Sequence, residues 1–133
     1  MVENDYMMRI IHEMVRTIVM LIFHKDQETE EELIFLDGVS QDFYQRLCHL
    51  ADVGKINEAE NMLYQNLEEN DWDKEETMVN LKVALAFYDL LNSKSNDFLE
   101  EHDYSREEVE EGIQRVMKLY GYGELAETLL ENR

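Results

Sequence analysis

The chain has 133 residues, of which 31 are acidic and 12 are basic, so its formal net charge is −19. This length predicts a single domain, residues 1–133, that can bury a core without disulfides. The basic residues are scattered singly, which argues against nucleic-acid binding, because phosphate backbones are bound mainly by clustered lysine and arginine. The same charge disfavours anionic membranes and anionic substrates. Solubility explains so acidic a surface, and mimicry of nucleic acid towards a basic protein is the alternative.

The first predicted helix is unusually apolar. Within RTIVMLIFHK only the seven residues from Thr17 to Phe23 are uncharged, which is too short for a membrane span of about twenty apolar residues. One stripe at spacings of three and four is Met8, Ile11, Val15, Ile18 and Ile22. A second, adjacent stripe is Met7, Ile10, Met14, Thr17 and Leu21. Two stripes leave only a narrow polar seam, so this helix is either central in its own domain or its second stripe meets another subunit.

The rest of the chain predicts further helices, since it holds no proline and no alternating valine-rich run. A second helix is expected to begin within the acidic run DQETEEE, with Glu28 to Glu32 at its positive end, and to stop near residues 37–38. A third is expected over about 41–52, with Ser40 as its N-cap, and a fourth over about 56–69.

A fifth helix is expected behind a capping box of Asp73 and Glu76, and it contains the apolar stretch VALAFY. Ser105 and Glu108 form a second capping box, whose helix holds Gly112 at a cost of about 1 kcal/mol unless a neighbour packs closely there. With a short helical turn before Ser105 and a last helix after a glycine turn, the sequence predicts an all-α fold. Six to seven helices are expected in antiparallel hairpins, as a tetratricopeptide-like stack or an irregular helical bundle.

A spacing occurs twice along the chain. Gly54, Ala59 and Leu63 are matched by Gly121, Ala126 and Leu130, which lie 67 residues later, almost twice the 34-residue tetratricopeptide period. Small residues at such positions let paired helices approach closely. The unit between them lacks the signature, so a true repeat array is less favoured than an irregular bundle that uses the same hairpin.

No reaction motif is recognisable. A carboxylate-bridged di-iron bundle needs a glutamate three residues before a histidine, and no histidine of this chain has one. The chain also lacks the pair of histidines four residues apart of a zinc protease, and it lacks a glycine-rich phosphate-binding loop. The single cysteine, Cys48, predicts a buried inert thiol, and without a recognisable leader sequence a cytoplasmic location is expected. We therefore expect no catalytic residue, no metal and no cofactor.

Three stretches carry a resemblance: NDYMMRIIHEMVRTIVMLIFHKD (4–26), ALAFYDLLN (84–92) and YSREEVEEGIQRVMKLYGY (104–122). With them the chain resembles a family of small, acidic, helical proteins of Gram-positive bacteria, classed as a domain of unknown function. The resemblance covers most of the chain and is weakest over residues 27–75. It implies an all-helical, tetratricopeptide-like, cytoplasmic protein, and it implies no activity, cofactor or binding residue.

Two functions are consistent with the sequence. The first is a non-enzymatic module that binds a protein partner, and that forms a homodimer through the first helix. Its candidate interface is Met8, Ile11, Val15, Ile18 and Ile22. The alternative is an enzyme or small-ligand binder with a pocket lined by acids and tyrosines. The candidate tyrosines are Tyr6, Tyr64, Tyr88, Tyr120 and Tyr122.

Overall fold

The computed structural model describes residues 2–23, 38–69 and 74–131. Seven helices and no strand occur in these ranges, which confirms the predicted all-α fold. The helices are α1 (Val2–Phe23), α3 (Gly38–Asp52), α4 (Ile56–Glu69), α5 (Lys74–Asn92), α6 (Asn96–Glu101), α7 (Arg106–Leu119) and α8 (Gly123–Glu131). The second helix expected before residues 37–38 and the capping box at Asp73 lie outside the described residues.

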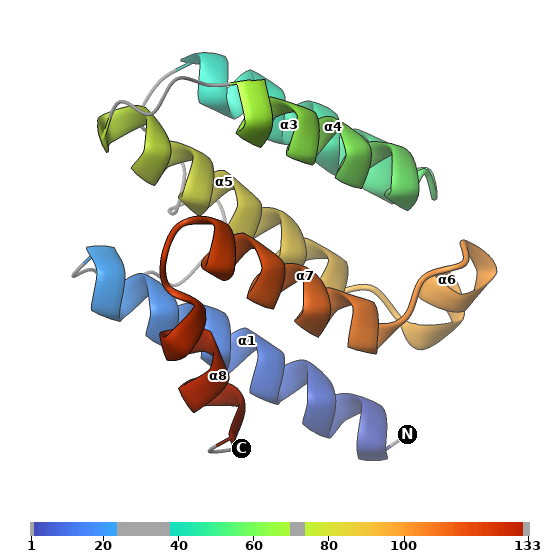
Figure 1. Ribbon diagram of the computed structural model, residues 1–133. Coiled ribbons are helices and arrows are strands. Elements are labelled where there is room, and N and C mark those ends of the chain that lie inside the picture. The colour runs from blue at the N-terminus through green and yellow to red at the C-terminus, as the bar shows by residue number, and fades with distance from the viewer. Residues whose placement is uncertain (1, 24–37, 70–73, 132–133) are drawn as a thin grey trace.

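The helices form three layers, in which the α5–α7 pair lies between the α3–α4 hairpin and the α1–α8 pair (Figure 1). Helix α5 is central because residues 81–89 are buried without interruption. That burial agrees with the apolar stretch VALAFY, which has no polar side to turn to solvent. The short helix α6 separates α5 from α7, an insertion that a simple two-helix repeat does not have.

The turns after α3 and α7 share one geometry. Gly54 and Gly121 have φ angles of +89° and +85°, the left-handed region that glycine adopts at low cost. In each turn the next residue donates back across the helix end, Lys55 to the carbonyl of Leu50 at 2.8 Å and Tyr122 to that of Met117 at 2.7 Å. This is the Schellman arrangement, and it explains why the glycine spacing occurs twice.

Ala59 and Ala126, which follow these turns, are both buried at the start of the next helix. Each position brings its helix close to the one that it reverses against, which is the role expected of a small residue. Leu63 is buried as well, whereas the side chain of Leu130 lies outside the described residues.

One predicted helix start is confirmed and one is wrong. Ser105 caps α7 in a complete capping box, accepting from the Glu108 backbone while Glu108 accepts from the backbone N–H of Ser105 at 2.8 Å. Ser40, in contrast, lies inside α3, which begins at Gly38. The capping preference of a serine is worth only about 1 kcal/mol, so it does not by itself fix where a helix begins.

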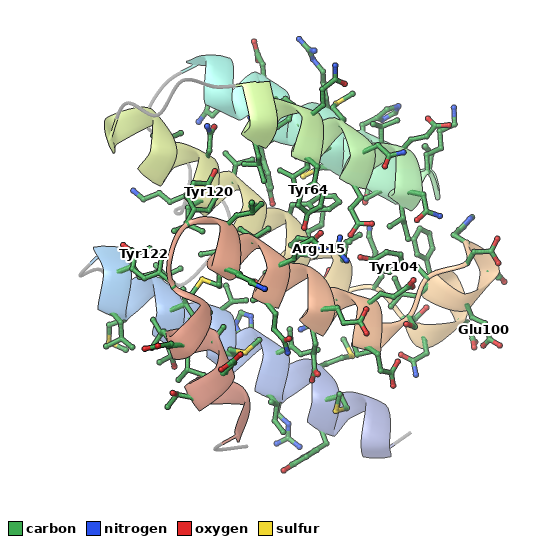
Figure 2. All side chains as sticks on the ribbon, viewed as in Figure 1. Tyr64, Glu100, Tyr104, Arg115, Tyr120 and Tyr122 are labelled. Atoms are coloured by element: carbon green, nitrogen blue, oxygen red, sulfur yellow. The ribbon has the colours of Figure 1, made fainter. Side chains whose placement is uncertain are left out.

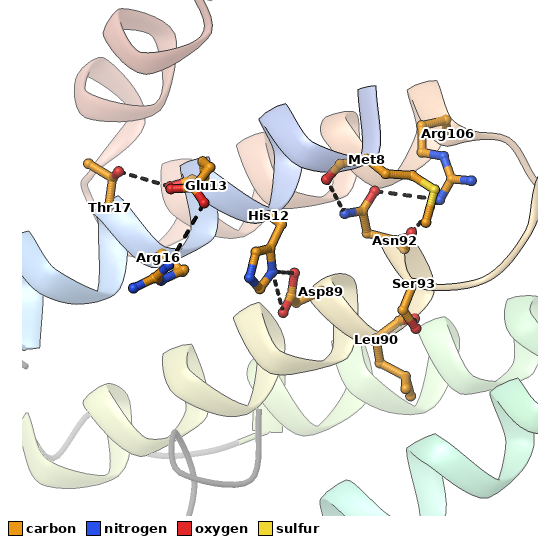
Figure 3. Close-up of polar contacts among 10 residues, drawn as sticks. All are labelled: Met8, His12, Glu13, Arg16, Thr17, Asp89, Leu90, Asn92, Ser93 and Arg106. Carbon is orange, nitrogen blue, oxygen red and sulfur yellow. Dashed lines mark hydrogen bonds and ion pairs between the residues drawn. The ribbon is translucent and has the colours of Figure 1, made fainter. Parts of the chain in front are cut away.

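Buried polar groups join α1 to the centre of the fold (Figure 3). His12 contacts the buried carboxylate of Asp89 with Nδ1 and Oδ1 2.9 Å apart. Asn92 at the end of α5 donates to the carbonyl of Met8 at 2.8 Å and in turn lies against Arg106. Helix α1 is therefore fixed to α5 by specific polar contacts as well as by its apolar side chains.

Candidate functional site

The first stripe of α1 faces the interior. Ile11, Val15 and Ile18 are buried in the hydrophobic core, and Ile22 packs against it. Met8 is partly buried. These three buried residues offer no surface to another subunit in the folded chain. This stripe therefore packs in the core of its own domain. An interface along α1 must use another face of the helix.

The outer side of α1 carries exposed apolar side chains. Tyr6, Met20 and Leu21 keep 54%, 48% and 51% of their surface accessible. Leu21 belongs to the second apolar stripe, whose member Met14 is buried, so that stripe runs along the boundary between core and solvent. Met20 and Leu21 are adjacent and form a small exposed apolar patch, whereas Tyr6 lies about 21 Å away along the helix.

A shallow groove lies on the α3–α4 hairpin. It encloses about 540 Å³ and is lined by Asp42, Gln45, Arg46, His49, Leu50 and Met62. Leu50 and Met62 are partly buried, whereas the other four are exposed. The groove is open to solvent and its charged side chains have no common sign, so its chemistry selects no ligand.

A polar cluster joins α4, α5 and the turn before α7, and we call it the Tyr–Glu cluster. It consists of Glu60, Tyr64, Tyr88 and Tyr104, with Arg115 beside it. Tyr88 and Tyr104 donate hydrogen bonds to Oε2 of Glu60 at 2.7 and 2.9 Å. Tyr64 and Tyr88 have their hydroxyl oxygens 3.1 Å apart. Because the proton of Tyr88 goes to Glu60, Tyr64 is the donor in that pair.

Gly112 makes this geometry possible. A Cβ on Gly112 would lie 2.2 Å from Cε1 of Tyr88, so the tyrosine ring occupies the space that any other residue of α7 would fill. The ring of Tyr88 is fully buried, and its hydroxyl still reaches the carboxylate on α4. A neighbour does pack closely at Gly112, and that neighbour is Tyr88, so the glycine has a packing reason that offsets its helical cost.

The phenols of the cluster are poor acids. Burial raises the pKa of Tyr88 and of Tyr104 far above the ordinary value, and the nearby charge of Glu60 adds to the shift. Burial likewise raises the pKa of Tyr64. At neutral pH all three are therefore hydrogen-bond donors, and none has the pKa near the working pH that a general base needs.

Alkaline titration should reveal this burial. The pKa of these phenols is higher in the folded chain than in the unfolded chain, where tyrosine ionises near about pH 10. Above that pH the unfolded state loses protons first, so the free energy of unfolding falls as the pH rises. We expect the ultraviolet phenolate signal of Tyr88 and Tyr104 to appear together with the loss of helical circular dichroism. Their ionisation in a chain that is still fully helical would contradict this assignment.

The five predicted tyrosines do not converge. Tyr64 and Tyr88 meet, whereas Tyr6 is exposed on α1, and Tyr120 and Tyr122 lie at the far end of α7 (Figure 2). Burial raises the pKa of Tyr120 to about 12. Tyr104 was missed, since its partner Glu60 is 44 residues away and no local pattern joins them.

In the described ranges no group of three or more His, Cys, Asp and Glu side chains is placed to hold a metal ion. No helix in the same part of the chain is long and apolar enough to span a membrane.

Residues 1–121 match the model of a family that is described as a family of unknown function, DUF6483. The chain belongs to this family. The match spans α1 to α7, so the whole Tyr–Glu cluster lies within the DUF6483 region. Comparison with curated proteins and with solved structures gives no match. Membership of DUF6483 assigns no activity, and the function must be argued from the residues.

Proposed function

We propose that this protein is a non-enzymatic, single-domain, cytoplasmic module that binds a protein partner and forms a homodimer through α1. The observation that carries the proposal is the exposure of Tyr6, Met20 and Leu21 on one helix. Contiguous exposed apolar side chains mark sites of association, and Met20 and Leu21 are contiguous at one end of the helix. Residues 1–23 also include adaptable methionines, which suit a partner surface.

The homodimer can be tested by measuring the solution mass with light scattering over a range of protein concentration. We expect the mass of the wild type to rise to that of a dimer. The substitution Met20→Glu/Leu21→Glu should keep the protein monomeric with unchanged helical circular dichroism, because both side chains are half exposed.

The matched control is Ile11→Glu/Ile18→Glu on the same helix. These side chains are fully buried, so two charges would enter the core and the helical signal should be lost. A wild type that stays monomeric at every concentration would contradict the homodimer, and an associating Met20→Glu/Leu21→Glu variant would contradict the assigned face.

We also propose that the protein binds neither nucleic acid nor membranes, and that it catalyses no reaction. The net charge of −19 supports the first part. The absence of catalysis is supported by the buried phenols, because their raised pKa keeps them protonated and unsuited to act as bases or nucleophiles. The alternative, a small-ligand site among tyrosines and acids, is favoured only by the hydrogen bonds of Tyr88 and Tyr104 to Glu60 and of Tyr64 to Tyr88.

A further inference from the structure

The carboxylate of Glu60 is held in one orientation by hydrogen bonds to only one of its two oxygens. Both phenol hydroxyls donate to Oε2. No hydrogen bond from a described residue reaches Oε1. Glu60 is only partly buried, unlike Tyr88 and Tyr104. The phenols therefore fix the orientation of a partly buried carboxylate through its Oε2, and no described donor occupies its Oε1.

An aromatic face lies beside this carboxylate. Tyr64 follows Glu60 by four residues on α4, so the two side chains occupy the same face of the helix. The guanidinium of Arg115, on α7, already lies over the Tyr64 ring, with Cζ 5.5 Å from the ring centroid. The nearby Tyr64 raises the pKa of Arg115, whose guanidinium is charged at neutral pH in any case. Figure 2 shows Tyr64 and Arg115 together between α4 and α7.

This arrangement fits a cation with a flat face. A guanidinium can stack on an aromatic ring while it donates to a carboxylate, which an ammonium does less well. Arg115 is exposed and its guanidinium lies over one face of the Tyr64 ring. It therefore occupies the position that an arginine of a partner would take. The net charge of −19 attracts a basic partner and repels an acidic one.

We infer that Glu60 and Tyr64 form a docking point for an arginine side chain of a basic protein partner, and that Arg115 covers it in the free protein. This docking point rests on the proposed function, because the arginine belongs to the protein partner proposed there. The docking point is separate from the exposed face of α1, because it lies on α4 and α7.

The test is a nuclear magnetic resonance titration with an acetylated and amidated Gly-Arg-Gly tripeptide at fixed ionic strength. We expect weak binding, with amide shifts concentrated at residues near Glu60, Tyr64 and Arg115. Glu60→Gln should weaken binding about tenfold, because it removes the charge and keeps an oxygen that the phenols can use. Arg115→Ala should strengthen binding severalfold, because it removes the competing guanidinium.

Glu58→Gln is the matched control, since it makes the same charge change at an exposed position of α4. Equal weakening by Glu58→Gln and Glu60→Gln, or shifts spread evenly over the acidic surface, would overturn the inference. If Glu60→Gln does not fold, Arg115→Ala decides alone, and unchanged or weaker binding by it overturns the docking point. The tripeptide needs no dimer, so a monomeric wild type in light scattering would reject the α1 interface and leave this result unaffected.

Discussion

Gly112→Ala should lower the free energy of unfolding by about 2–3 kcal/mol, although the same change in an open helix stabilises by about 1 kcal/mol. The new Cβ would lie 2.2 Å from the buried ring of Tyr88, which must then move. Its movement breaks the 2.7 Å hydrogen bond to Glu60 and the contact with Tyr64. Chemical denaturation followed by circular dichroism measures the loss.

Gly123→Ala is the control for this prediction. A Cβ at Gly123 would meet Lys118 at 3.6 Å, an ordinary contact distance, so that variant should be as stable as the wild type or slightly more stable. Equal stability of the Gly112→Ala and Gly123→Ala variants would show that the Tyr88 ring gives way without cost, and that the close approach of α5 and α7 is not fixed there.

Arg106→Met should cost about 3 kcal/mol of unfolding free energy. Arg106 is buried at the start of α7 and donates to the carbonyls of Asn92 and Lys94 at 2.5 and 2.9 Å, and to Oδ1 of Asn96 at 2.6 Å. Methionine fills much of the same volume but leaves these acceptors without a donor, and each unsatisfied buried group costs about 1–3 kcal/mol. Denaturant titration gives the value.

Lysine at this position should recover little of the loss, because a single ammonium cannot reach three acceptors that a planar guanidinium spans. Lys118→Met, which removes an exposed cation from the other end of α7, should change stability by less than about 1 kcal/mol. A cost for Arg106→Met no larger than that for Lys118→Met would mean that water replaces the guanidinium at this junction.

The sequence predicted those parts of the fold that depend on neighbours along the chain. The bounds of α4, the capping box at Ser105 and the twofold occurrence of the glycine turn are set by residues within a few positions of each other. Ser40 shows the limit, since α3 begins before it. A local preference worth about 1 kcal/mol is easily outweighed by one more helical turn that the surroundings favour.

The site was less predictable because it depends on packing between helices. Periodicity finds two apolar stripes on α1, but both are about equally apolar, so it does not decide which one faces the core. The Tyr–Glu cluster joins residues up to 44 positions apart, and Tyr104 has no local feature that marks it as a partner of Glu60. Glycine inside a helix lowers its stability, and this marked Gly112 in the sequence. The ring that fills the space beside it belongs to Tyr88 on α5, which no local pattern indicates.

The pairing of α1 with α5 has a kinetic consequence. The contacts that fix it, His12 with Asp89 and Met8 with Asn92, join residues 77 and 84 positions apart, whereas α3 and α4 are joined by a tight turn. Contacts of such long range form late in folding, because the chain must close a large loop first. During synthesis α1 leaves the ribosome well before α5 exists, and its buried stripe has no surface to pack on until then. Early folding is therefore the stage at which this chain is most exposed to aggregation, and at which a chaperone would find its N-terminal helix open.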